Sequence, residues 1–260
     1  MIDSLQVSVV IPVFNEELVL HEFYPRLKKE AENWDKSYEL LFVDDGSTDN
    51  SFELICKWKK VDSNIRVIKF TRNFGQQAAV LAGFRQSRGD IVVQIDSDLQ
   101  NPPEEIKRLL GAFTDEVDLV VTVPRKRRDS SLRVLGSKVL HSLAQALFGS
   151  RFKLNLSSFR AMRRSVIEKI DQCQDRSRYM AVLMSWMAVP TVHVEVDHHL
   201  RKTGQTKYGI LPLLRLTWDL ITGYSNFPLR LVTYRIIRCR SGIRDNDVSV
   251  VSALGSWNLN

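Results

Sequence analysis

Short apolar runs alternate with helical patterns through the first 123 residues, and this alternation constrains the fold more than any other feature of the chain. The runs are near-continuous and end at Asn, Asp, Gly or Pro, which is typical of parallel strands covered on both faces. The expected strands are Val7–Val13, Glu39–Val43, Arg66–Phe70, Asp90–Ile95 and Asp118–Val123, and the expected helices are Glu16–Trp34, Asp49–Lys60, Gln76–Ser87 and Pro103–Phe113. This alternation predicts a doubly wound, mostly parallel α/β sheet with helices on both faces.

The pattern changes after Pro124. A basic loop, RKRRDSSLR, precedes an expected long helix at Leu132–Phe148, a short segment at Ser157–Met162 and helical stretches around Val166–Ile170 and Arg178–Met187. An alternating strand follows, with Val192, Val194 and Val196 on one side and polar residues on the other.

Residues Ile210–Asn226 form the last pattern. Arg215, Asp219, Thr222 and Asn226 make one narrow polar stripe on a helix that is otherwise apolar. Flanking cations favour a helix lying in a membrane interface, and packing against the domain or a partner is the alternative. A membrane-spanning helix is not predicted, because the chain has no stretch of 18 apolar residues.

Charge is distributed unevenly along the chain. Residues up to Asp118 include 14 Lys+Arg and 21 Asp+Glu, whereas the remainder includes 23 and 9. The basic second half indicates an anionic partner such as a phosphate or a membrane surface. Three widely separated cysteines predict neither a disulfide framework nor a cysteine metal site, so a reducing cytosol is the default.

Acidic and polar residues follow three of the expected strands. Ligands of doubly wound sheets bind at the carboxyl ends of the strands. The candidate residues there are Pro12, Asn15 and Glu16 after the first strand, Asp44 and Asp45 after the second, and Asp96, Asp98 and Gln100 after the fourth. Two carboxylates one residue apart suit Mg²⁺ or Mn²⁺ on a diphosphate, and a solvated turn capped at Asn101 is the alternative.

Several function classes lack their motifs here. The sequence has no phosphate-binding glycine loop of the P-loop type, no Gly-x-Gly-x-x-Gly after the first strand and no Gly-x-Ser-x-Gly elbow. These absences disfavour a P-loop NTPase, a dinucleotide-dependent dehydrogenase and an α/β-hydrolase. No nucleic-acid-binding module is recognisable either, so nucleic acid is not an expected partner.

Six segments occur in the order found in a known family: VVIPVFNEE, VDDGSTDN, RNFGQQAAVLAG, DSDLQNPPE, SSFRAMRRS and GQTKYG. From about Val7 to Val232 the chain resembles family 2 glycosyltransferases of the GT-A fold. Within that family it is most similar to the polyprenyl-phosphate branch, which includes dolichol-phosphate mannose synthases and bactoprenol glucosyltransferases.

The resemblance implies a role for each candidate residue. Pro12, Asn15, Glu16, Asp44, Asp45 and Asp96 would bind a nucleotide sugar, and Asp96, Asp98 and Gln100 would bind Mg²⁺ or Mn²⁺. Asp96, Asp98 and Arg125 would be catalytic, with Arg125 meeting a diphosphate oxygen. The lipid phosphate would meet Arg133, Lys138, Arg160, Arg201 and Lys207, since arginine forks suit phosphate geometry.

The expected activity is an inverting, metal-dependent transfer of a sugar to polyprenyl phosphate, for cell-envelope glycan synthesis. The enzyme would work as a peripheral protein at the cytoplasmic face of the membrane, and a homo-oligomer is left open. A same-fold transferase with a non-lipid acceptor and an inactive, truncated binding protein are the alternatives.

Two departures from the family bear on these expectations. Many bactoprenol glucosyltransferases carry Asp where this chain has Ser158, so the general base stays unassigned. The residues after Arg230 are too polar for the two membrane helices usual in bacterial members of the branch. We therefore predict a catalytic domain at 1–208, an amphipathic helix at 209–232 and an atypical, disordered tail at 233–260.

Overall fold

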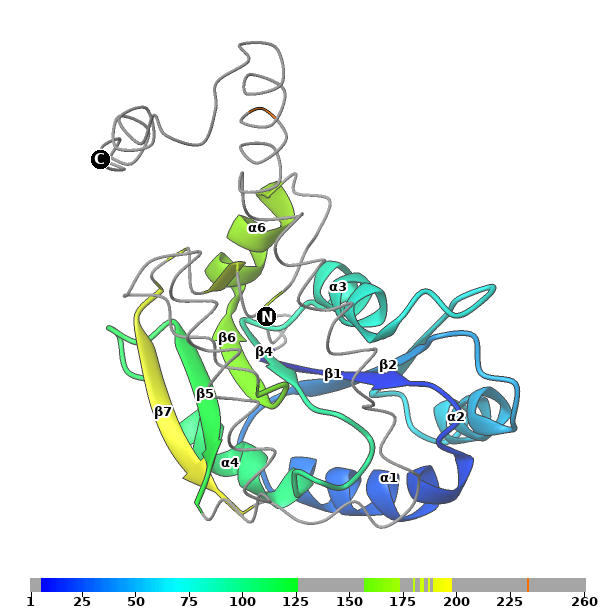
Figure 1. The fold of residues 1–260 in the computed structure, drawn as a ribbon. Coiled ribbons are helices and arrows are strands. Elements are labelled where there is room, and N and C mark those ends of the chain that lie inside the picture. The colour runs from blue at the N-terminus through cyan, green and yellow to red at the C-terminus, as the bar shows by residue number, and fades with distance from the viewer. Residues whose placement is uncertain are drawn as a thin grey trace, which may run out of the picture. The chain divides into compact units, whose positions relative to one another are not determined.

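The computed structural model describes residues 6–125, 157–173 and 189–197, together with Met180, Leu183, Met184, Met187 and Thr233. Its centre is a seven-stranded sheet in the order β3-β2-β1-β4-β6-β5-β7 (Figure 1). The strands are β1 (Val7–Val13), β2 (Tyr38–Asp44), β3 (Ile65–Lys69), β4 (Ile91–Gln94), β5 (Leu119–Pro124), β6 (Arg160–Arg163) and β7 (Thr191–Val196). Only β6 runs antiparallel to its neighbours, β4 and β5, which confirms the predicted mostly parallel sheet.

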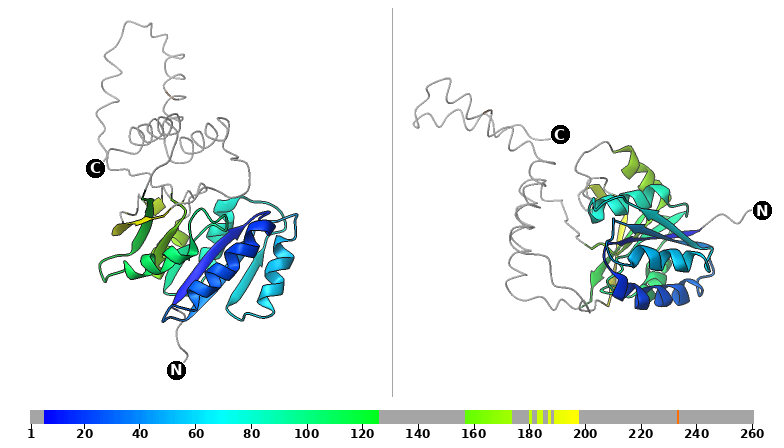
Figure 2. Two further views of the ribbon diagram at one scale, coloured as in Figure 1. Left: turned by 90° about the horizontal axis from the view of Figure 1, so that it is seen from below. Right: turned by 90° about the vertical axis from the view of Figure 1, so that its right-hand side faces the viewer.

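Helices cover both faces of the sheet. They are α1 (Glu17–Ala31), α2 (Ser51–Lys59), α3 (Gln76–Gln86), α4 (Ile106–Gly111), which follows the short 3-10 turn η1 (Pro103–Glu105), and α6 (Arg164–Gln172). Figures 1 and 2 show α1, α2 and α4 on one face and α3 and α6 on the other. No helix among the described residues is both long enough and apolar enough to cross a bilayer.

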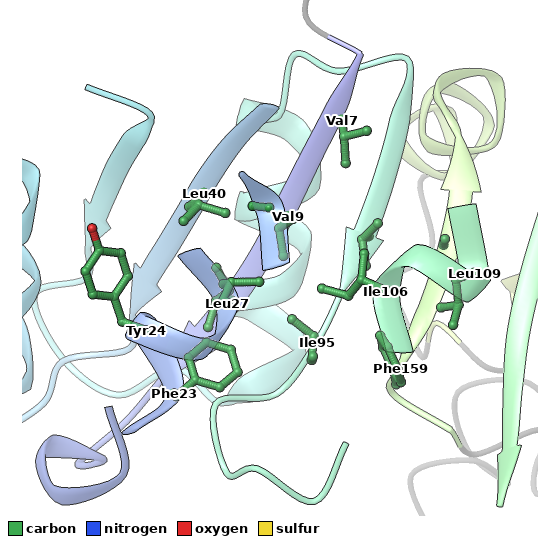
Figure 3. Packing of buried hydrophobic residues seen from close by; sticks show 14 of the residues in the cluster. Val7, Val9, Phe23, Tyr24, Leu27, Leu40, Ile95, Ile106, Leu109 and Phe159 are labelled. Atoms are coloured by element: carbon green, nitrogen blue, oxygen red, sulfur yellow. The ribbon is translucent and has the colours of Figure 1, made fainter. Parts of the chain in front are cut away.

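The main core lies between the sheet and the α1–α4 layer. Alternate residues of β1, among them Val7 and Val9, face Leu27 of α1, while Ile106 and Leu109 of α4 pack in the same cluster (Figure 3). Every residue of β1 is buried, as expected for a strand covered on both sides. Each large apolar side chain buried in this way stabilises the fold by about 1.5–3 kcal/mol.

Helix α3 lies very close to the opposite face of β1. A Cβ on Gly83 would sit 2.3 Å from Cγ1 of Val10 and 3.2 Å from Cγ2 of Val43. Glycine is therefore required for this approach, which sets the height of α3 above the sheet. The height matters because the first residue of α3, Gln76, reaches the end of β4.

The structure departs from the sequence expectations in the second half of the chain. The segment expected at Ser157–Met162 includes the antiparallel strand β6, and the expected alternating strand is β7. The helix expected at Pro103–Phe113 begins as a 3-10 turn and ends at Gly111. The helices expected at Leu132–Phe148 and Ile210–Asn226 lie outside the described residues, and the domain boundaries stay a prediction.

Replacing Gly83 with Ala should lower the free energy of unfolding by about 1–3 kcal/mol, because the added methyl must displace the stiff side chain of Val10. Gly111→Ala is the matched control, since a Cβ there meets nothing within 4 Å. Urea unfolding followed by circular dichroism measures both changes. Equal stability of the two variants would contradict the close approach of α3.

Candidate active site

The carboxyl ends of β2, β1 and β4 lie side by side, because these three strands are parallel neighbours in the sheet. The backbone N–H of Asp45 donates to the carbonyl of Val13 at 2.8 Å. The hydroxyl of Ser97 lies 3.5 Å from the carbonyl of Pro12. The structure thus brings the candidate residues of all three strand ends to one edge of the sheet.

The loops after β1 and β2 are joined by hydrogen bonds around Asn15. Its backbone has a left-handed φ of 54°, a conformation that asparagine tolerates better than most residues. The Asn15 side-chain oxygen accepts from the N–H of Thr48 at 2.8 Å, and its own N–H donates to the hydroxyl of Ser47 at 3.0 Å. The N–H of Glu16 donates to the hydroxyl of Ser51 at 3.0 Å. Asn15 and Glu16 therefore have fixed backbones beside Asp44.

Asp44 and Asp45 are both buried but are used differently. Oδ2 of Asp44 accepts from the N–H of Ser47 at 3.3 Å, whereas its buried Oδ1 has no hydrogen-bond partner. The two oxygens of Asp45 accept from the N–H groups of Phe74 at 2.7 Å and Gly75 at 2.9 Å. Asp44 consequently keeps a free acceptor for a ligand, while Asp45 holds the loop before α3.

Asp96 follows β4 and is held by two side chains. Its Oδ1 accepts from Nε2 of Gln76 at 2.7 Å, and its Oδ2 accepts from the hydroxyl of Ser158 at 2.5 Å. Burial raises the pKa of Asp96 above its ordinary value. The charge of Asp98 adds to this rise, whereas the two hydrogen bonds and the charge of Arg160 oppose it.

A tight turn places Asp98 and Gln100 just beyond Asp96. The residue between them, Leu99, has a left-handed φ of 59°, which is strained for a side chain of this kind. Leu99 is nonetheless buried in the main core, and this burial stabilises the strained turn. Oδ1 of Asp98 accepts from the N–H of Gln100 at 3.0 Å, which closes the turn.

Arg160, predicted to meet a lipid phosphate, lies beneath this site and is only 5% exposed. Burial lowers its pKa to about 10, and the charge of Asp96 opposes that shift. Its Nη1 contacts the sulfur of Met184 at 3.1 Å, and its Nε has no partner. The facing residue on β4, Gln94, also has a buried oxygen without a partner. The guanidinium thus retains an unused donor close to the acidic edge.

Arg125 ends up at the surface, one residue past β5. Its side chain is 46% exposed and its Nη1 lies 3.3 Å from Oδ1 of Asp197. The other four residues predicted to bind the lipid phosphate, Arg133, Lys138, Arg201 and Lys207, lie outside the described residues.

Sequence reasoning missed the roles of Gln76 and Ser158. The antiparallel register pairs Gln94 with Arg160, and continuing it by two residues pairs Asp96 with Ser158 on the same face of the sheet. That pairing was not foreseen because the segment Ser157–Met162 was not expected to be a strand. Gln76 lies within the motif RNFGQQAAVLAG, but nothing in that motif indicates that its amide reaches a strand end.

The donors after β4 fit a hard divalent cation. Carboxylate oxygens of Asp96 and Asp98 and the side chain of Gln100 are oxygen ligands of the kind that Mg²⁺ and Mn²⁺ prefer. Within the described ranges, no three His, Cys, Asp or Glu side chains gather around one point. A site here would therefore draw its remaining ligands from water and a bound phosphate, as magnesium sites commonly do.

Comparison with known proteins identifies the family. The model of glycosyl transferase family 2 matches residues 8–171, which is more than half of the chain. The chain belongs to glycosyl transferase family 2. It is a glycosyltransferase, and the sequence-based assignment of the family is confirmed.

Two similar proteins carry the same description. Undecaprenyl-phosphate 4-deoxy-4-formamido-L-arabinose transferase of Proteus mirabilis is 39% identical over 229 residues, which cover 88% of this chain and 70% of the relative. The protein of that description from Shewanella sediminis is 40% identical over 228 residues, covering 87% and 69%.

Solved structures support the fold. Glucosyl-3-phosphoglycerate synthase from Mycobacterium tuberculosis, crystallised with Mn²⁺, UDP and phosphoglyceric acid, has a TM-score of 0.59 at 20% identity and covers 94% of this chain and 81% of its own. TarS 1–349 from S. aureus has a TM-score of 0.51 at 19% identity, covering 73% and 58%. These likenesses confirm the predicted GT-A fold.

Asp96→Asn should stabilise the protein at neutral pH when a chelator is present. A carboxylate whose folded-state pKa is raised lowers stability once it ionises in the unfolded chain, so the penalty is absent at low pH and grows above about pH 4. Asparagine removes the charge and can still hydrogen-bond to Gln76 and Ser158.

Thermal unfolding at several pH values measures this effect. The melting temperature of Asp96→Asn should exceed that of the wild type at pH 7 and approach it near pH 4. A variant that is less stable than the wild type at pH 7, or a difference that does not change with pH, would contradict the assignment.

Proposed function

We propose that this glycosyltransferase moves a sugar from a nucleoside-diphosphate sugar to a polyprenyl phosphate, as a peripheral enzyme at the cytoplasmic face of the membrane. The observation that carries the proposal is the identity of about 40%, across almost nine tenths of the chain, to the two undecaprenyl-phosphate sugar transferases. The acidic edge of the sheet, with its free acceptor on Asp44, supplies the chemistry that a nucleotide sugar requires.

In the proposed reaction, a phosphate oxygen of the acceptor attacks the anomeric carbon of the donor sugar. The bond from that carbon to the diphosphate oxygen breaks, its electron pair leaves with the nucleoside diphosphate, and the configuration inverts. A phosphate monoester is already anionic at neutral pH, so the reaction needs no strong general base. This agrees with Ser158, which donates its proton to Asp96 and is not placed as a base.

The chain's own residues would share the work as follows. Asp44, Asn15 and Glu16 bind the nucleoside, and Asp96, Asp98 and Gln100 hold a divalent cation, which when bound neutralises charge on the departing diphosphate. Arg125 can exchange its exposed partner Asp197 for a diphosphate oxygen, because surface ion pairs are worth only about 0–1 kcal/mol. Arg160 carries the positive charge nearest the cation site.

One experiment tests the acceptor and the donor together. Purified full-length chain is incubated with UDP- and GDP-sugars, including a nucleoside-diphosphate form of 4-deoxy-4-formamido-L-arabinose, and release of nucleoside diphosphate is measured. We expect release from one donor to depend on undecaprenyl phosphate and on Mg²⁺ or Mn²⁺, and to stop with excess EDTA. Release that depends on 3-phosphoglycerate or another soluble acceptor instead would overturn the proposal.

Asp98→Asn should reduce the transfer rate at least about a hundredfold at saturating Mn²⁺, since it removes a charge from the cation site. The amide oxygen can still accept from the N–H of Gln100, so the turn is kept. Asp115→Ala, in the exposed turn after α4, is the matched control and should transfer at the wild-type rate. Wild-type activity in Asp98→Asn would show that this carboxylate has no catalytic role.

A further inference from the structure

Two neighbouring elements grip the carboxylate of Asp96. Ser158 stands opposite Asp96 in the continued register of β4 and β6, and its hydroxyl donates to Oδ2 at 2.5 Å. Gln76, the first residue of α3, donates to Oδ1 at 2.7 Å. Each oxygen of the carboxylate therefore accepts one hydrogen bond from a different side of the sheet edge.

The Gln76 side of this grip is itself anchored. Gly75 has a left-handed φ of 95° and begins α3, and its N–H is held by Oδ2 of Asp45 at 2.9 Å. Phe74 is held by the other oxygen of Asp45 at 2.7 Å. The buried end of β2 thus fixes the loop that aims Gln76 at the end of β4.

We propose that Gln76 and Ser158 are positioning residues that hold the Asp96 carboxylate in the orientation in which it binds the divalent cation. This inference rests on the proposed function, which makes Asp96 a cation ligand. A carboxylate oxygen has two lone-pair sites, so each oxygen of Asp96 keeps one site after accepting its hydrogen bond. Two fixed donors restrict the rotation of the carboxylate and direct the remaining lone pairs.

The magnitude follows from the behaviour of groups that orient metal ligands. Removing such a hydrogen-bond partner weakens metal binding by about 10–100-fold in known metal sites. Burial of Asp96 increases the need for a grip, because a desolvated carboxylate without donors is costly. Loss of either donor should therefore weaken cation binding without changing the chemical step once the site is filled.

The test measures Mn²⁺ binding directly, by the electron paramagnetic resonance signal of free Mn²⁺ over the full chain with the donor nucleotide present. Ser158→Ala and Gln76→Ala should each raise the Kd for Mn²⁺ about tenfold or more. In the transfer assay the same variants should raise the Mn²⁺ concentration for half-maximal rate and recover kcat at saturating Mn²⁺. Ser158→Thr keeps a hydroxyl and should bind Mn²⁺ within about threefold of the wild type.

The adjacent residues supply matched controls. Ser157 bonds instead with the hydroxyl of Thr122 at 2.7 Å, and Gln77 is an exposed residue of the same helix turn, so Ser157→Ala and Gln77→Ala should bind Mn²⁺ like the wild type. Gln76 is itself exposed, so Gln76→Ala keeps the test valid if Ser158→Ala fails to fold.

Three results would overturn the inference. Wild-type Kd values in both alanine variants, with transfer still dependent on Mn²⁺, would reject the positioning role and leave the proposed function standing. Equal weakening in Ser157→Ala or Gln77→Ala would assign the effect to general loosening of the loop. Sugar transfer by a wild-type chain that binds no Mn²⁺ would reject the cation role of Asp96, and the inference with it.

Discussion

The cost of burying a carboxylate at the end of β4 organises this site. Asp96 has left water, and its ionised form is stabilised by two hydrogen bonds and by the charge of a buried arginine. Each source of stabilisation comes from a different element: Gln76 from α3, Ser158 from the chain before β6, and Arg160 from β6 itself. The antiparallel insertion of β6 beside β4 is therefore what makes a buried acid tolerable there.

The opposite end of the sheet shows how a buried carboxylate is treated when no ligand is expected. Glu39 accepts from the hydroxyl of Ser8 at 2.5 Å, from the N–H of Arg88 at 2.8 Å and from Nη1 of Arg66 at 2.7 Å. Glu39 thus has partners for both oxygens, including a full positive charge. At the carboxyl end, by contrast, buried atoms of Asp44, Gln94 and Arg160 have no partners. Buried polar groups without partners are rare in folded proteins and concentrate where a ligand binds.

The parallel part of the fold and its acidic edge could be predicted from the sequence, because buried parallel strands are continuous apolar runs and their carboxyl ends are followed by polar residues. The antiparallel strand could not, since β6 has only four residues, two of them arginine, and pairs with β4 about 70 positions away. Short strands of this kind are defined by their partners rather than by their own pattern. The same limit hid Ser158 and Gln76, whose roles depend on contacts across 62 and 20 residues.

The arrangement also links the two substrates through charge. Arg160 is desolvated, so burial favours loss of its proton, and the negative charge of Asp96 opposes that loss. A cation bound at Asp96 and Asp98 would neutralise the charge that stabilises Arg160 and would leave the guanidinium in need of another anion. Its free Nε is the atom from which a phosphate oxygen could accept a hydrogen bond. Cation binding and recognition of an anionic phosphate then favour each other, so the same pair of buried charges would tie a filled donor site to capture of the acceptor.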